Sequence, residues 1–219
     1  KDDKGNIKRV AIEVPNQINN PSPAWTKAPL DLKDEDYVNN NYVIMVTKKG
    51  ITKKTSLEQY SRPRANGINA ITIKDGDELL EAKLTDGNSQ IMIAVKSGKA
   101  IRFEENKTRP MGRNASGVRG ITLAGKNDEV VGMVSISHED DNILVVSEKG
   151  YGKRSSLEDY RITNRGGKGV KTINITDKTG KLVSIKNVTD NDDLMIINRS
   201  GLTIRMAVSD LRVMGRATQ

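Results

Sequence analysis

The chain has 219 residues, with 36 Lys or Arg against 28 Asp or Glu, so its formal net charge is +8. It contains no cysteine, which excludes a disulfide scaffold and a thiolate metal site. No apolar stretch approaches the length of a membrane span and no signal peptide is recognisable, so we expect no membrane association and a cytoplasmic location.

The first 41 residues contain no clear copy of the pattern that fills the rest of the chain. Residues 4–9 resemble residues 49–54, whereas residues 15–36 hold four of the six prolines and no basic loop. We predict that residues 1–41 are either a degenerate or partial first blade or a linker.

From residue 42 onward, one pattern of about fifty residues repeats. Its copies are residues 42–90, 91–142, 143–193 and a partial copy, 194–219. Each copy opens with a short apolar run, and a glycine follows that run at positions 50, 98, 150 and 201. A fixed period of this length is typical of propellers and solenoids.

Each copy predicts four strands. The apolar run is short and ends in a turn, which favours a strand buried on both faces. The second strand alternates, so its basic residue is expected to project from the sheet; that residue is Lys54, Arg102, Arg154 or Arg205 in the four copies. Third strands are expected at 68–73, 118–123 and 170–175, and fourth strands at 79–84, 130–136 and 182–188. We therefore predict an all-β fold of four-stranded, propeller-like blades.

A loop rich in glycine and arginine follows the second strand of each copy. These basic loops 1 to 4 are residues 61–67, 109–117, 161–169 and 212–216. Arginine and lysine bind phosphate oxygens, and glycine lets backbone N–H groups approach them. One such loop alone would be read as a solvated turn, but its recurrence favours a binding face for a polyanion.

The candidate DNA-binding residues lie in these loops and just after them. They are Arg62, Arg64, Arg109, Arg113, Arg119, Arg161, Arg165, Gly166, Gly167, Lys168, Gly169, Lys171, Arg212 and Arg216. We expect no catalytic residue and no metal ligand set. The sequence around Lys168 lacks the glycine and hydroxyl positions of a Walker loop, and His138 is the chain's one histidine.

Residues 151–172 resemble the hallmark stretch of the C-terminal domain of the DNA gyrase A protein. That family's gyrase A box reads Gln-Arg-Arg-Gly-Gly-Lys-Gly, and residues 165–169 match its last five positions. Its first two positions are Thr163 and Asn164 here, so one arginine of the box is absent.

The resemblance implies a β-pinwheel, a disc of four-stranded blades that exchange strands, with about four to five blades in this chain. It implies that the domain wraps double-stranded DNA without sequence preference and so directs negative supercoiling. The catalytic residues, ATP and Mg belong elsewhere in that holoenzyme, and the implied partners are the gyrase A N-terminal domain and gyrase B. Two alternatives stay open: the equivalent domain of topoisomerase IV, and a propeller that serves as a protein-interaction platform.

Overall fold

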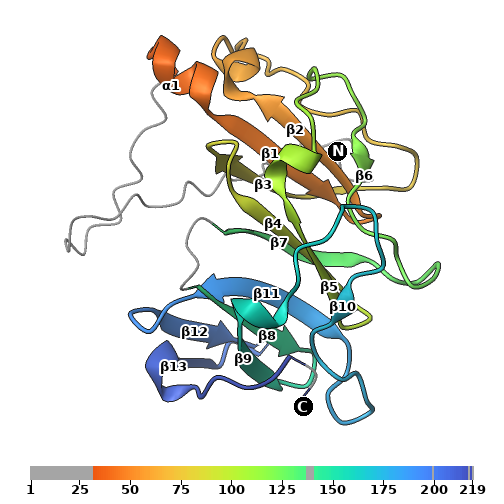
Figure 1. Ribbon diagram of the computed structural model, residues 1–219, viewed down its shortest axis with the longest axis vertical. Coiled ribbons are helices and arrows are strands. Elements are labelled where there is room, and N and C mark those ends of the chain that lie inside the picture. The colour runs from red at the N-terminus through yellow and green to blue at the C-terminus, as the bar shows by residue number, and fades with distance from the viewer. Residues whose placement is uncertain (1–31, 137–140, 199, 217, 219) are drawn as a thin grey trace.

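The computed structural model describes residues 32–136, 141–198, 200–216 and 218. Their strands form antiparallel sheets that follow one another along the long axis of the molecule in chain order (Figure 1). The all-β prediction is therefore confirmed. A partial blade or a linker is predicted for residues 1–41; of these, residues 1–31 lie outside the described residues.

The strands are β1 (Tyr42–Thr47), β2 (Ile51–Ser56), β3 (Leu79–Thr85), β4 (Gln90–Val95), β5 (Lys99–Glu104), β6 (Val118–Arg119), β7 (Val130–Ile136), β8 (Asn142–Ser147), β9 (Gly152–Ser156), β10 (Val170–Lys171), β11 (Leu182–Val188), β12 (Asp193–Ile197) and β13 (Thr203–Ala207). A short helix, α1 (Glu35–Asn40), precedes them, and 3-10 turns η1 (Leu57–Tyr60), η2 (Glu105–Lys107), η3 (Leu157–Asp159) and η4 (Val208–Asp210) follow the second strands. The turn glycines 50, 98, 150 and 201 all have positive φ, which hairpin turns at these places require.

The third strand of a repeat joins the sheet of the repeat before it. The sheet orders are β3-β1-β2-β6, β10-β5-β4-β7, β11-β8-β9 and β12-β13. Thus β6 pairs with β2 and β10 pairs with β5, each across a boundary between repeats. This exchange is the pinwheel arrangement. The expected third strands were too long, because only two residues pair in each, and residues 68–73 form no strand.

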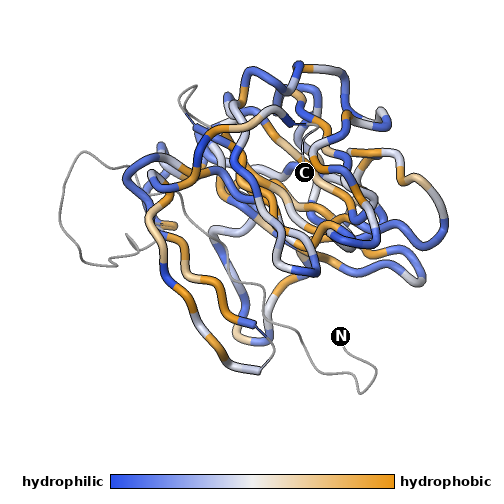
Figure 2. The backbone as a smooth tube through the Cα atoms, turned by 90° about the horizontal axis from the view of Figure 1, so that it is seen from below, coloured by the Kyte–Doolittle hydropathy of each residue, from blue (hydrophilic) through white to orange (hydrophobic). Residues whose placement is uncertain are grey.

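Apolar packing lies between neighbouring sheets. One cluster joins Ile44 and Val46 of β1 to Ile91 and Phe103 of the second repeat. Another cluster joins β4 and β7 to β8, η3 and β11. In Figure 2 most of the apolar backbone lies in the middle of the molecule and most of the peripheral loops are polar, although one apolar hairpin lies at the edge. Each blade therefore buries its faces against the next blade, which is how stacked repeats gain a core.

The basic residue of the second strand points inward, so the expectation that it projects is wrong in three of four repeats. Arg102 Nη1 donates to the carbonyls of Leu157 at 2.8 Å and Tyr160 at 3.0 Å. One repeat later, Arg154 Nη1 donates to the carbonyls of Val208 and Leu211. Both guanidiniums fasten the 3-10 turn of the following repeat.

The first repeat uses an ion pair in the same place. Lys54 Nζ lies 3.3 Å from Glu105 Oε1, and both side chains are buried. Glu105 occupies the position that Leu157 and Val208 hold in later repeats, at the start of the 3-10 turn. A buried charge needs a partner, so removal of either side chain would leave the other charge uncompensated between the blades.

The fourth apolar run is exposed, contrary to the expectation of burial on both faces. Met195 and Ile197 are 65% and 63% exposed. Their sheet has two strands, whereas β1, β4 and β8 each have a second neighbour, β3, β7 or β11. The described residues thus provide no equivalent of β3, β7 or β11 to cover this run. Within the same ranges, no helix has the length and apolar character needed to cross a membrane.

Replacing Arg102 by methionine should lower the free energy of unfolding by about 2–3 kcal/mol, because two buried carbonyls lose a charged donor. Arg205→Met is the matched control, since Arg205 is the equivalent residue but lies exposed and pairs with Asp193 of its own hairpin. Its removal should leave unfolding nearly unchanged. Equal effects of the two substitutions in urea unfolding curves would contradict the inward, stapling role of Arg102.

Candidate nucleic-acid interface

The basic loops lie at the outer edge of the blades. Strand β7 contacts both β3 and β11. These three strands, each at one edge of its sheet, therefore form the inner side of the row of blades. β6 and β10 are the opposite edges of their sheets, and basic loops 2 and 3 lead directly into them. The strand exchange therefore places each loop over the preceding blade.

Basic loops 2 to 4 are anchored to the preceding repeat at their entrance, and loops 2 and 3 also at their tip. A parallel bridge joins Pro110 to Lys54, Ile162 to Arg102 and Val213 to Arg154 at the loop entrance. At the loop tips the anchors are Thr72 and Thr122. Thr122 donates from Oγ1 to the Gly166 carbonyl at 2.6 Å and from its amide to the Gly167 carbonyl at 2.8 Å. Thr72 holds the carbonyls of Asn114 and Ala115 in the same way.

These anchors turn backbone N–H groups outward. The C=O and N–H of a trans peptide point in opposite directions. Because the carbonyls of Gly166 and Gly167 point to Thr122, the amides of Gly167 and Lys168 point away from it. Neither amide donates to another group in the part of the chain that the structure describes. Two consecutive free amides form a small anion-binding surface.

One arginine in each of basic loops 2, 3 and 4 has a structural partner. Arg165 donates to the carbonyls of Lys107 at 2.9 Å and Arg119 at 3.0 Å. At equivalent positions, Arg113 reaches the Asn69 carbonyl and Arg216 reaches the Lys171 carbonyl at 2.9 Å. These three guanidiniums are half-buried and join each loop to the loop before it. Arg165, the first of the five residues that match the gyrase A box, therefore donates its hydrogen bonds to the neighbouring loop region.

The other candidate cations are exposed. They are Arg62, Arg64, Arg109, Arg119, Arg161, Lys168, Lys171 and Arg212. Lys171 makes one long contact, 3.5 Å to Asn174 Oδ1, and the side chains of the remaining seven form no hydrogen bond or ion pair among the described residues. Arginines and lysines without internal partners are available for phosphate oxygens.

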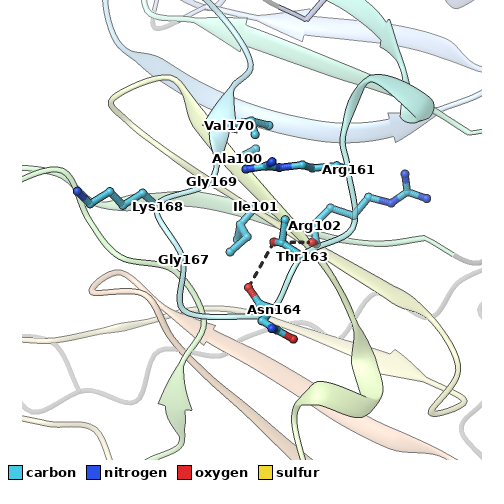
Figure 3. A pocket seen from close by; sticks show the side chains of 10 residues that line it. All are labelled: Ala100, Ile101, Arg102, Arg161, Thr163, Asn164, Gly167, Lys168, Gly169 and Val170. Atoms are coloured by element: carbon cyan, nitrogen blue, oxygen red, sulfur yellow. Dashed lines mark hydrogen bonds between the residues drawn. The ribbon is translucent and has the colours of Figure 1, made fainter.

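A shallow hollow of about 350 Å³ opens beside the box residues. Figure 3 shows Arg161 and Ile101 along it and Lys168 extending outward from the loop. Gly169 closes the hollow with φ +70°, and a Cβ there would lie 2.5 Å from the Ala100 carbonyl oxygen. Glycine at this position thus lets the loop approach β5 closely, which is a packing requirement as well as an opening for phosphate.

Lys99 is a further candidate contact, which its sequence position does not single out. Its partner in the exchanged pairing is Lys171, so two lysines stand directly opposite on antiparallel strands. Like charges in this arrangement repel unless an anion lies between them. The signal is invisible in the sequence, because the two residues are 72 positions apart and meet only through the strand exchange.

The sequence matches the family described as DNA gyrase C-terminal domain, beta-propeller, in four segments: residues 41–86, 90–137, 141–189 and 192–219. The chain belongs to this family. It is 45% identical over 190 residues to the DNA gyrase A protein of Staphylococcus aureus strain MRSA252, a match that covers 86% of this chain. The chain spans about a fifth (21%) of that relative's length.

Two solved structures have the same fold. The C-terminal domain of DNA topoisomerase IV matches with a TM-score of 0.78 and 25% identity, over 82% of this chain and 56% of that one. The DNA gyrase A C-terminal domain matches with a TM-score of 0.74 and 22% identity, over 82% and 60%. The predicted pinwheel of four-stranded blades and the family resemblance are confirmed, whereas the individual DNA contacts stay predictions.

Replacing Gly169 by alanine should destabilise the chain more than replacing Gly150 does. Both glycines have positive φ, but a Cβ at Gly150 would meet nothing within 4 Å, whereas one at Gly169 meets the Ala100 backbone. Both variants share a backbone strain of about 1 kcal/mol, and Gly169→Ala adds the collision with β5. Urea unfolding measures the difference, and equal losses would show that the loop does not depend on this close approach.

Proposed function

We propose that this chain is a non-catalytic DNA-binding and DNA-wrapping domain of the DNA gyrase A protein. It bends duplex DNA around its basic edge and so directs negative supercoiling by an ATP-dependent type II topoisomerase. The recurrence of exposed cations supports this most strongly. Basic loops 2 to 4 sit at one place relative to the preceding blade, and all four loops present one or more free cations outward.

A continuous cationic edge fits a duplex better than a small ligand. Bending a duplex of 20–30 base pairs by 40–90° costs on the order of 1–6 kcal/mol. Counterion release from several phosphates can offset that cost and gives binding that depends steeply on salt. Contacts to phosphate carry little sequence information, so the DNA bound would be of any sequence.

The fold alone does not separate gyrase from topoisomerase IV, because both C-terminal domains resemble this chain closely. The sequence favours gyrase, through the 45% identity to a gyrase A protein and through the near-complete box at residues 165–169. In the whole enzyme, the partners would be the gyrase A N-terminal domain and gyrase B, and ATP and Mg would be bound outside this domain.

Wrapping should change the linking number of circular DNA. Nicked plasmid is incubated with the chain at low salt and sealed with ligase, and the topoisomers are then resolved. A shift that grows with protein concentration and disappears at high salt is expected, since phosphate contacts hold the bend. An unchanged linking number together with measurable binding would contradict wrapping and would show that the chain binds DNA without wrapping it.

Comparison of Lys168→Ala with Arg165→Ala should distinguish a residue that contacts DNA from one that positions the loop. Lys168 is exposed without a partner, so its loss should lower DNA affinity and reduce the salt slope by about 1 while unfolding stays unchanged. Loss of Arg165 removes two hydrogen bonds between loops, so affinity and stability should both fall. Lys126→Ala, on an exposed turn of the acidic half-repeat, is the charge-matched control. Fluorescence anisotropy at several salt concentrations measures the slopes. If the Lys168 variant bound DNA like the control, Lys168 would not be a DNA contact.

A further inference from the structure

Two buried lysines lie beneath the basic loops. Lys53 and Lys153 hold equivalent positions on β2 and β9 and are 0% and 3% exposed. A lysine is rarely buried this deeply unless an acidic partner neutralises it. Neither ammonium forms an ion pair within the described residues. Each is therefore a buried positive charge without an ion-pair partner, placed under a loop.

The partners of both ammonium groups are backbone carbonyls. Lys53 Nζ donates to Arg113 O at 2.5 Å, in basic loop 2, and to Ala70 O at 2.6 Å, in the same repeat as Lys53. Lys153 Nζ donates to the carbonyls of Gly215 and Thr218, both at 2.9 Å, and to that of Arg216, around basic loop 4. One side chain thus holds the inner face of the next repeat's loop.

This contact orients loop 2 toward an anion. The Arg113 carbonyl points inward to Lys53, so the Asn114 amide of the same peptide points outward. That amide donates to no group of the described residues, and Asn114 itself is exposed. The loop therefore presents a free N–H outside and a cation directly behind it.

In basic loop 3, which carries the box, the lysine is on the exposed side and an apolar residue is beneath the loop. The position equivalent to Lys53 is Ile101, and a Cβ at Gly167 would lie 3.4 Å from its Cδ1. The lysine of this loop is Lys168, on the exposed side. In loop 2 the residue equivalent to Lys168 is Ser116, since each directly precedes the glycine that touches the preceding blade. Loop 2 thus has its lysine, Lys53, beneath it, and loop 3 has its lysine, Lys168, on its exposed side.

We propose that Lys53 and Lys153 are positioning residues of the DNA interface, which hold basic loops 2 and 4 from beneath and supply there the positive charge that Lys168 supplies from the surface of loop 3. The inference rests on the proposed function, with duplex DNA as the ligand. It assigns the second and fourth loops a share of the binding that their surface residues alone do not reveal.

A pH dependence should accompany this arrangement. Burial, together with the nearby Arg113, lowers the pKa of Lys53 to about 8. Burial lowers the pKa of Lys153 to about 8 as well, against the opposing effect of Asp159 and with a further decrease from Arg216. The neighbouring tyrosines, Tyr60 and Tyr160, have pKa values raised by burial and stay neutral in this range.

The sign of the effect follows from the phosphate charge. A phosphate above the loop favours the charged ammonium, so DNA raises the pKa of these lysines and binding takes up protons near pH 8. Affinity should be greatest below about pH 7 and should decrease as the pH rises through about 8 toward 9.5.

The experiment measures binding of a mixed-sequence linear duplex to the whole chain at constant ionic strength between about pH 7 and about pH 9.5. Calorimetry in two buffers of different ionisation enthalpy reports proton uptake by the unsubstituted chain, which needs no variant. Lys53→Met with Lys153→Met should weaken binding at pH 7 by about threefold to tenfold per lysine and abolish the proton uptake. Lys126→Met is the control with the same loss of charge, and thermal melting confirms that each variant is folded.

A charge swap makes the test specific. Lys53→Ile with Ser116→Lys gives loop 2 the arrangement of loop 3, so affinity at pH 7 should recover while the contribution of loop 2 to proton uptake stays absent. A purely structural lysine would lower the melting temperature but leave pH-dependent binding intact, and that result, or binding without proton uptake, overturns the inference while DNA binding stands. A chain that binds no duplex at any pH overturns the proposed function itself.

Discussion

Strand β6 leaves its own repeat to pair with β2, and β10 leaves its repeat to pair with β5. The hydrogen bonds of a β-ladder fix the position of a chain segment to within one residue, because a slip would reverse every side chain. Each of basic loops 2 and 3 ends at such an exchanged strand. The entrances of loops 2 to 4 are also bonded to the preceding blade, at Lys54, Arg102 and Arg154. The spacing of the loops is therefore set by the spacing of the blades.

The basic residues form two groups: buried ones that join neighbouring repeats and exposed ones that are available for DNA. Arg102, Arg154 and Lys54 are buried and fasten one repeat to the next, while Arg119, Arg161 and Lys168 face outward without partners. A net charge of +8 conceals this division. For DNA, the outward set matters, since buried guanidiniums that already bond carbonyls have few donors to spare. The half-buried arginines Arg113, Arg165 and Arg216 lie between the two groups and keep neighbouring loops in register.

The hydrogen bonds of the box loop explain why glycine is needed there more than once. Gly169 allows close contact with β5, Gly166 has a φ of +83°, which glycine adopts readily, and Gly167 offers a free amide. Packing and phosphate binding thus favour the same residue type for different reasons. The two demands are met in one short loop because strand exchange presses it against the blade below.

Local residue patterns were enough to predict the period, the four-stranded unit and the places of the fourth strands, because apolar runs and turn glycines recur in each copy. They also located the exposed cations of the loops, since short glycine-rich segments seldom bury their side chains. The stacking of the blades, in contrast, decides which repeat each third strand joins, why 118–123 and 170–175 pair through just two residues, and which basic residues turn inward.

The pairs Arg102 with Tyr160, Lys53 with Arg113 and Lys99 with Lys171 each cross a repeat boundary. Contacts between residues separated by about a whole repeat or more depend on how one blade packs on the next, and no local pattern of residues encodes that.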